Sequence, residues 1–110
     1  MADVAKSGGS NQSLVSGLSN YNNNQWYFVM FTRDAVAWYL FVNGAQVNAV
    51  INSLTAPIVN AQELWIGRSA YLGGSYQWVG DIGQIFVYNR ALAGDEVVQD
   101  YNATKATYGL

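Results

Sequence analysis

Apolar residues in this chain occur in short runs that polar and glycine-rich stretches separate. The runs at 25–31 (QWYFVMF) and 36–42 (VAWYLFV) are apolar at both odd and even positions, which is typical of strands covered on both faces. Asn43-Gly44 lies between the second run and a third one, AQVNAVI at 45–51. Because Asn-Gly is the dipeptide best suited to a two-residue type I′ turn, the pattern predicts a β-hairpin here.

Two further runs in the second half of the chain also have strand character. ELWIG at 63–67 is short and ends at a glycine, and the stretch at 80–88 supplies β-branched and aromatic residues that suit a pleated surface. The glycine-rich segment at 69–80 between them, SAYLGGSYQWVG, is predicted to be an aromatic loop, with or without a short strand inside it. Counting these runs gives five or six strands.

The C-terminal stretch has a different period. Acidic residues are followed by Val97, Val98 and Tyr101 at helical spacing, which predicts one short amphipathic helix near Gly94 to Ala103.

The N-terminal residues 1–24 are rich in Ser, Gly and Asn, and we expect them to be weakly structured, with Leu14, Val15 and Leu18 in one weak strand. Neither a repeat nor a linker divides the chain, so residues 1–110 are predicted to form a single domain.

Composition narrows the classes of function. Charged residues make up only 11% of the chain and apolar residues 51%, which indicates a packed core and a neutral, amide-rich surface. The net charge is −2 and the five basic residues are scattered, so nucleic acid is not an expected partner. No apolar run reaches the roughly 20 residues that cross a bilayer, and the N-terminus lacks the apolar core of a secretory signal. We therefore expect neither membrane insertion nor classical export.

Several motifs together resemble the laminin G-like modules of the concanavalin A-like lectin and glucanase superfamily. They are Trp26 at the start of a strand, FVNG at 41–44, Ile66-Gly67 at a strand end, and Gly80, Ile82 and YNRAL at 88–92 before a helix. The resemblance covers about residues 25 to 108. It implies an all-β fold, an antiparallel jelly-roll β-sandwich, with one short C-terminal helix. The final run YNATKATYGL is also similar to the tails of such modules in bacteriophage structural proteins.

The chain departs from the family's pattern in three ways. Gly83 stands where the family usually has an acidic residue, and Ala93 stands where it usually has a Ser or Thr helix cap. Because a lost capping oxygen costs about 1 kcal/mol, we expect Asp95 and Glu96 to help hold the helix start. The additional N-terminal strands of complete modules have little room before Trp26. This implies a truncated sandwich with an edge or apolar face that a neighbouring chain covers.

The residues available for chemistry argue against an enzyme. The chain has no His and no Cys, which excludes the common nucleophilic triads and the usual transition-metal sites. The closely spaced acidic strand motif of the superfamily's glucanases is absent, and Asp34, Glu63 and Asp81 are isolated. No cofactor is expected. Calcium, which some modules of this family bind at the sandwich rim, has Asp34 as its candidate ligand, but an Asp that forms a turn or a salt bridge beside Arg33 is the favoured interpretation.

Carbohydrate binding has a candidate site in the glycine-rich segment. Tyr71, Tyr76, Gln77 and Trp78 combine aromatic faces, which stack on sugar rings, with an amide that bonds hydroxyl groups. A role of these aromatic residues in the core or in subunit contacts is the alternative, and is slightly favoured. The other tryptophans, Trp26, Trp38 and Trp65, are expected on strands as structural residues.

Two classes of function remain. The favoured one is a non-enzymatic virion structural protein, which decorates a capsid or forms part of a tail as a homo-oligomer, with a trimer favoured, together with other virion proteins. Low charge, aromatic content and the resemblance to phage modules support it. The alternative is a carbohydrate-binding module that attaches to a glycan surface.

Overall fold

The computed structural model describes residues 2–5, 11–14, 21–51, 65–68 and 77–110. The chain forms two compact units, of which the first comprises residues 1–57 together with 88–110 and the second comprises residues 58–87. The prediction of a single domain over residues 1–110 stays a prediction.

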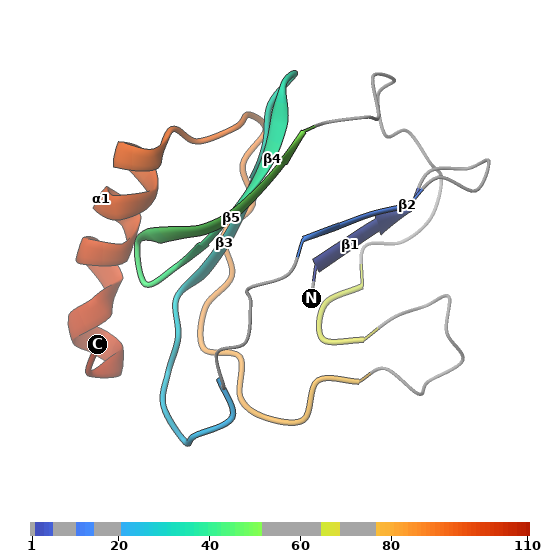
Figure 1. Cartoon of the computed structure of the whole chain (residues 1–110). Coiled ribbons are helices and arrows are strands. Elements are labelled where there is room, and N and C mark those ends of the chain that lie inside the picture. Colours follow the sequence, from blue (N-terminus) through green and yellow to red (C-terminus); the bar gives the residue numbers. More distant parts are fainter. Residues whose placement is uncertain (1, 6–10, 15–20, 52–64, 69–76) are drawn as a thin grey trace. The chain divides into compact units, whose positions relative to one another are not determined.

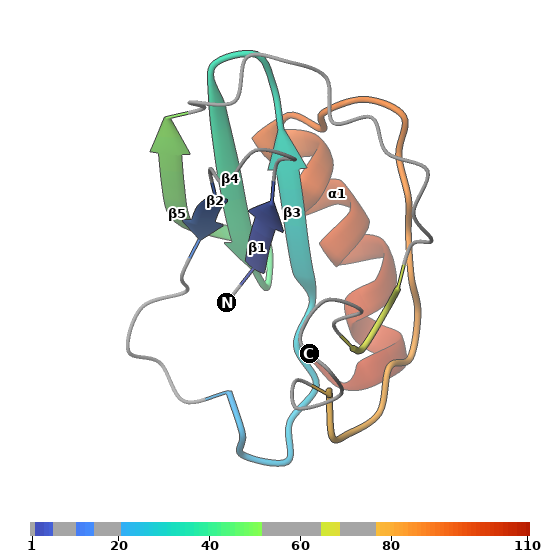
Figure 2. The same ribbon diagram turned by 90° about the vertical axis from the view of Figure 1, so that its right-hand side faces the viewer.

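The first unit contains a three-stranded antiparallel sheet and a helix. The strands are β3 (Val29–Arg33), β4 (Ala37–Val42) and β5 (Ala45–Ile51), in the order β3-β4-β5. The helix α1 spans Gly94–Thr104 and continues into a 3-10 turn at Lys105–Tyr108. Both ribbon views place α1 along one face of this sheet (Figure 1, Figure 2). A separate antiparallel pair is formed by β1 (Ala2–Ala5) and β2 (Asn11–Leu14).

The predicted β-hairpin between β4 and β5 is confirmed. Asn43 has φ 49° and Gly44 has φ 78°, the two positive values that a type I′ turn requires. The Asn43 side chain also holds the backbone of Phe28, the residue before β3, because its Oδ1 accepts a hydrogen bond from the Phe28 N–H at 3.0 Å. The Asn43 N–H donates to the Phe28 carbonyl at 2.8 Å. The turn residue therefore ties both hairpin strands to the chain that precedes β3.

The core of this unit is built around β4, the central strand. On one side, Phe41 packs with Met30, Leu92 and Val97, so that α1 and the segment that leads into it close this face. Trp38 and Leu40 form a second buried cluster, against which Val50 packs. Successive side chains of β4 point to opposite faces, and each of the two clusters buries one of them, so both faces of β4 are buried, as its continuous apolar pattern predicts.

The same expectation is wrong for β3. The strand begins at Val29 instead of at Gln25, and Val29 and Phe31 are exposed while Met30 and Thr32 are buried. The strand lies at one end of the sheet order, with α1 on only one of its faces. Val29 and Phe31 lie on the face of β3 that α1 does not cover, so the run at 25–31 overstates the burial of this strand.

The helix begins where the acidic first turn predicts. Ala93 has no side-chain oxygen, and the Glu96 carboxylate accepts a hydrogen bond from the Ala93 N–H at 2.9 Å. Glu96 also pairs with Arg90, at 2.6 and 2.7 Å, across the segment that leads into the helix. Val97 is fully buried, as expected, but Val98 is exposed, so the apolar stripe is narrower than the sequence predicts.

Several predicted strands differ in the structure. Trp65, Ile66 and Gly67 form no strand, and residues 81–88 form none either. Both segments have apolar sequences, but a strand requires a neighbouring backbone in register, which the local pattern does not specify. Near the N-terminus, two strands replace the single one expected. Leu14 ends β2, whereas Val15 and Leu18 lie outside the described residues.

The described residues therefore show a mostly β structure with one C-terminal helix. The complete antiparallel jelly-roll β-sandwich stays a prediction. Within the described ranges, no helix has the length and apolar character needed to cross a membrane.

Candidate functional site

The predicted carbohydrate-binding residues fall in the second unit. Tyr71 and Tyr76 lie outside the described residues, whereas Gln77 and Trp78 are described, and both are exposed. Gln77 forms an antiparallel bridge with Arg68, and next to it the Trp78 N–H donates to the Gly67 carbonyl at 2.6 Å. We call these four residues, Gly67, Arg68, Gln77 and Trp78, the bridge region.

The Trp78 indole lies against the backbone of Gly80. Gly80 has φ 150°, and a Cβ placed on it would lie 3.1 Å from the Trp78 Nε1. The indole therefore lies directly over a residue that has no side chain to displace it. Trp78 is nevertheless 64% exposed, so much of its surface faces water. This arrangement positions an aromatic surface without burying it.

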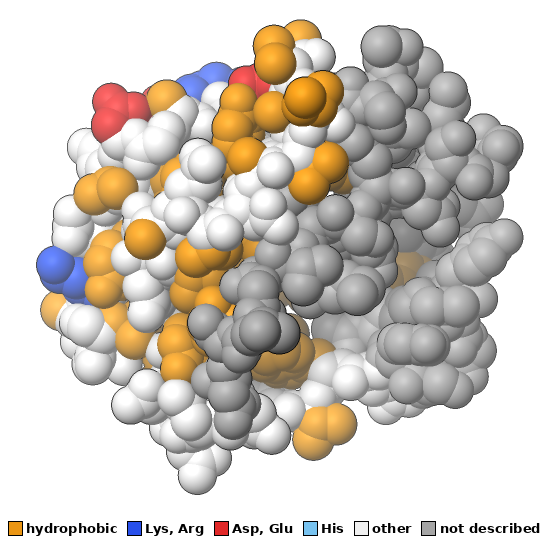
Figure 3. Space-filling model, viewed as in Figure 1, with side chains coloured by type: hydrophobic (Ala, Val, Ile, Leu, Met, Phe, Trp, Pro, Cys, Tyr) orange, Lys and Arg blue, Asp and Glu red, His pale blue; other side chains and the backbone are white. Residues whose placement is uncertain are grey.

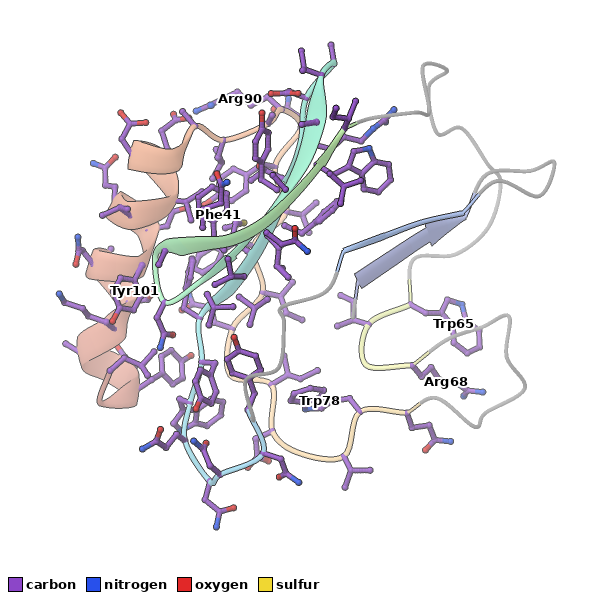
Figure 4. The ribbon with its side chains drawn as sticks, viewed as in Figure 1. Phe41, Trp65, Arg68, Trp78, Arg90 and Tyr101 are labelled. Carbon is purple, nitrogen blue, oxygen red and sulfur yellow. The ribbon has the colours of Figure 1, made fainter. Side chains whose placement is uncertain are left out.

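Gln77 and Trp78 lie on opposite faces of the bridge region. Residues paired across antiparallel strands share a face, and successive residues alternate, so Gln77 lies on the face of Arg68. A Cβ placed on Gly67 would lie 3.7 Å from the Trp78 Cβ and 3.4 Å from the Ile82 Cδ1, which places Trp78 and Ile82 on the other face. Figure 4 shows the Trp65 and Arg68 side chains projecting away from Trp78. Gln77 and Trp78 therefore lie on opposite faces of the bridge, and the predicted site of Tyr71, Tyr76, Gln77 and Trp78 stays a prediction.

Arg68 and Trp65 form a contact that the sequence analysis missed. The Arg68 Cζ lies 4.5 Å from the centroid of the Trp65 ring, within the range of a cation–π interaction. Trp65 was expected to be a structural residue on a strand, but it is 39% exposed and outside any strand. Trp26, also expected on a strand, is likewise 39% exposed, whereas Trp38 is buried in β4 as predicted. The only sequence signal for the new contact is the three-residue spacing of Trp65 and Arg68.

Asp34, the candidate calcium ligand, forms a turn. Its Oδ1 accepts hydrogen bonds from the Val36 and Ala37 N–H groups, each at 2.7 Å, and its own N–H donates to the Ala37 carbonyl at 3.0 Å. The bonds from Ala37 and Val36 lower the pKa of the Asp34 carboxyl. This carboxylate connects β3 to β4, in agreement with the favoured interpretation. The described residues contain no group of three or more acidic side chains that could hold a metal ion.

Two carboxylates of α1, those of Glu96 and Asp100, are engaged in contacts within the chain. The Arg90 guanidinium and the Ala93 N–H lower the pKa of the Glu96 carboxyl to about 2. The Tyr88 hydroxyl donates to the Asp100 Oδ2 at 2.6 Å, and this bond raises the pKa of Tyr88. These contacts fasten residues 88–90 to the helix. They are consistent with a structural role for this acidic group.

Comparison with known proteins places the chain in a family. The family model for Laminin G, described as the concanavalin A-like lectin/glucanases superfamily, matches residues 2–98. This confirms the resemblance, and the match extends it over the N-terminal residues. No curated protein matches the chain.

One solved structure is similar in fold. It is an S-layer domain-containing protein (residues 221–444) from Clostridium thermocellum, with 24% sequence identity and a TM-score of 0.63. The match covers 90% of this chain and 49% of that chain, so the present chain spans about half its length.

Proposed function

We propose that this chain, which belongs to the concanavalin A-like lectin/glucanases superfamily, is a non-enzymatic structural module of a virion. In this role it holds neighbouring subunits together through surface contacts and assembles as a homo-oligomer, with a trimer favoured. The observation that carries the proposal is an exposed apolar segment at residues 78–87.

This apolar segment has the composition of a contact surface. Its exposed members are Trp78, Val79, Ile82, Ile85, Phe86 and Val87. Val79 is 95% exposed, so its side chain contributes almost nothing to packing within the chain. Interfaces between subunits are depleted in charge and enriched in aromatic residues, which is the character of this segment. On the side of the molecule drawn in Figure 3, the described residues have many apolar and few charged side chains.

The chemistry of the chain supports a non-enzymatic role. It has no His and no Cys, and its described acidic residues include Asp34 in a turn and Glu96 in an ion pair. Glycoside hydrolysis needs two carboxyl groups facing each other across a substrate. Groups already committed to backbone and guanidinium partners are poorly suited to that task.

Sedimentation velocity at micromolar concentrations tests the structural proposal. We expect a concentration-dependent oligomer, which the double variant Val79→Lys with Val87→Lys weakens by at least about tenfold in dissociation constant. Val36→Lys is the matched control, because Val36 is also exposed, at 68%, but lies in the turn between β3 and β4. A monomer at all concentrations, or equal loss in both variants, contradicts the role of residues 78–87.

Glycan binding is the second candidate function, and Trp78 favours it. An indole that is 64% exposed and held over Gly80 offers a prepared surface for the C–H face of a sugar ring. Because protein contacts already hold the indole in place, binding would immobilise little additional side-chain freedom.

A glycan array on the purified protein tests this candidate. We expect Trp78→Ala to weaken binding by about 1 to 3 kcal/mol and to leave the melting temperature nearly unchanged. Trp26→Ala is the control, because Trp26 is an exposed tryptophan of the first unit that contacts Tyr108. Equal binding by wild type and Trp78→Ala contradicts the assignment.

A further inference from the structure

The described residues contain two pairs of Arg and Trp that differ in accessibility. In the first unit, the Arg33 Cζ lies 5.2 Å from the ring centroid of Trp38, which is 1% exposed. In the second unit, the Arg68 Cζ lies 4.5 Å from the ring centroid of Trp65, which is 39% exposed. The first pair belongs to the packed sheet. The second pair can meet a ligand from solution.

The Arg68 guanidinium has unused hydrogen-bonding capacity. It forms no ion pair with any described residue, and its charged end lies over the Trp65 ring. Arg90 provides the contrast, because its Nη1 and Nη2 donate to the two oxygens of the Glu96 carboxylate. A guanidinium presents its N–H donors in a planar fork that matches the two oxygens of a carboxylate. The Arg68 guanidinium can therefore donate to the carboxylate of a ligand in the way that the Arg90 guanidinium donates to Glu96.

The neighbours of Arg68 add a polar group and an aromatic ring to this surface. Gln77 lies across the antiparallel bridge on the same face, and its side chain is exposed. Trp65 supports the guanidinium from one side. An amide, an aromatic ring and a cation on one face suit a sugar ring that carries both hydroxyl groups and an acidic group. A neutral sugar would leave the cation without its best partner.

We propose that Arg68, Trp65 and Gln77 form a binding site for a carboxylate-bearing sugar residue, such as a uronic or a sialic acid. The proposal rests on the glycan-binding candidate function and specifies its ligand class. It also assigns Gln77 to this face, separately from Trp78. The carboxylate lies against the Arg68 fork, and the ring hydroxyl groups lie near the Gln77 side chain.

Matched saccharides isolate the contribution of the carboxylate. The probes are oligogalacturonate and sialyllactose, each with its carboxyl-reduced neutral counterpart, measured by isothermal titration calorimetry on the full chain. We expect the wild-type protein to prefer at least one of the acidic probes over its reduced form by about tenfold or more. Which acidic probe binds distinguishes uronic from sialic acid. The preference should fall as salt rises, since exposed charges are screened.

Variants then locate the preference. Arg68→Gln should abolish it, and Arg68→Lys should retain only part of it, because an ammonium keeps the charge but loses the fork. Arg33→Gln is the matched control: it removes the same charge and the other contact with a tryptophan, and it should leave the preference unchanged. Melting temperatures confirm that each variant is folded.

The possible failures are distinguishable. If the glycan array finds neutral ligands but neither acidic probe is preferred, or if Arg68→Gln keeps the preference, the Arg68 site is wrong and glycan binding stands. If neither the array nor the probes show binding, both ideas fall.

Discussion

The sheet-and-helix core of the first unit and the bridge region of the second use aromatic side chains in opposite ways. Phe41 and Trp38 are 5% and 1% exposed, because Phe41 packs with Leu92 and Val97 and Trp38 packs in the cluster with Leu40 and Val50. Trp65 and Trp78 are 39% and 64% exposed, on segments that the structure joins by a single antiparallel bridge. Phe41, Trp38 and Trp65 belong to apolar runs of the sequence, whereas Trp78 belongs to the glycine-rich segment at 69–80.

The difference shows that pairing, and not apolarity, decides which aromatic residues become core. A side chain on a central strand is surrounded by neighbours that the sheet brings to it, whereas an isolated bridge brings only the residues of one pair. The aromatic side chains of the first region therefore stabilise the fold. The second presents aromatic groups, a cation and an amide to solvent, and so it is the region where binding is expected.

The largest expected effect is the loss of a core aromatic. Phe41→Ala should lower the free energy of unfolding by about 3 to 5 kcal/mol, because Phe41 packs against Met30, Leu92 and Val97. Trp78→Ala removes a larger ring but should cost less than about 1 kcal/mol, since surface changes are usually small. Urea denaturation followed by circular dichroism measures both. Similar losses in the two variants would show that Trp78 is a core residue after all.

A pair of glycines gives an intermediate effect. Gly44 and Gly67 have φ of 78° and 77°, so alanine meets the same backbone strain at each, about 1 kcal/mol. A Cβ at Gly44 would also lie 2.9 Å from the Tyr101 Cδ1, whereas at Gly67 the nearest atom is the Ile82 Cδ1 at 3.4 Å. Gly44→Ala should therefore destabilise the protein more than Gly67→Ala in the same denaturation experiment. An equal cost would remove the Tyr101 contact from the account of the hairpin.

The smallest expected effect is the loss of stability at low pH that the Glu96 carboxylate contributes. The Arg90 guanidinium and the Ala93 N–H lower the pKa of Glu96 from 4.5 to about 2, so the folded state favours the ionised form. This stabilisation is complete above pH 4.5 and is lost as the pH falls towards 2. The melting temperature of Glu96→Gln should therefore fall less over this interval than that of the wild type. The difference will be small, since the Arg90 side chain is 59% exposed. Parallel pH profiles would show that the pair does not persist in solution.

Local signals explain how much of the fold could be predicted. The Asn43-Gly44 turn and the start of α1 depend on residues adjacent in sequence, and both appear where expected. The runs at 63–67 and 80–88 needed distant partners, which their own residues do not specify, and their described parts form no strand.

The candidate site shows the same limit. Gln77 and Trp78 are adjacent in sequence, and the prediction grouped them in one candidate site on one loop, but a paired backbone directs successive side chains to opposite faces. Arg68 was missed because its relation to Trp65 and Gln77 depends on that pairing. Residue types indicated the chemistry of the region, and only the backbone geometry divided it into two faces.

The burial of Trp38 gives the protein an internal optical reporter. It is the one strongly buried indole among the four tryptophans of the chain, all of which are described. Indole fluorescence moves to shorter wavelengths when water is excluded, so the folded protein should emit one blue component beside three redder ones. An aqueous quencher such as iodide will extinguish the redder components first. The light that remains comes from β4, and its decay during unfolding records the moment at which the sheet opens.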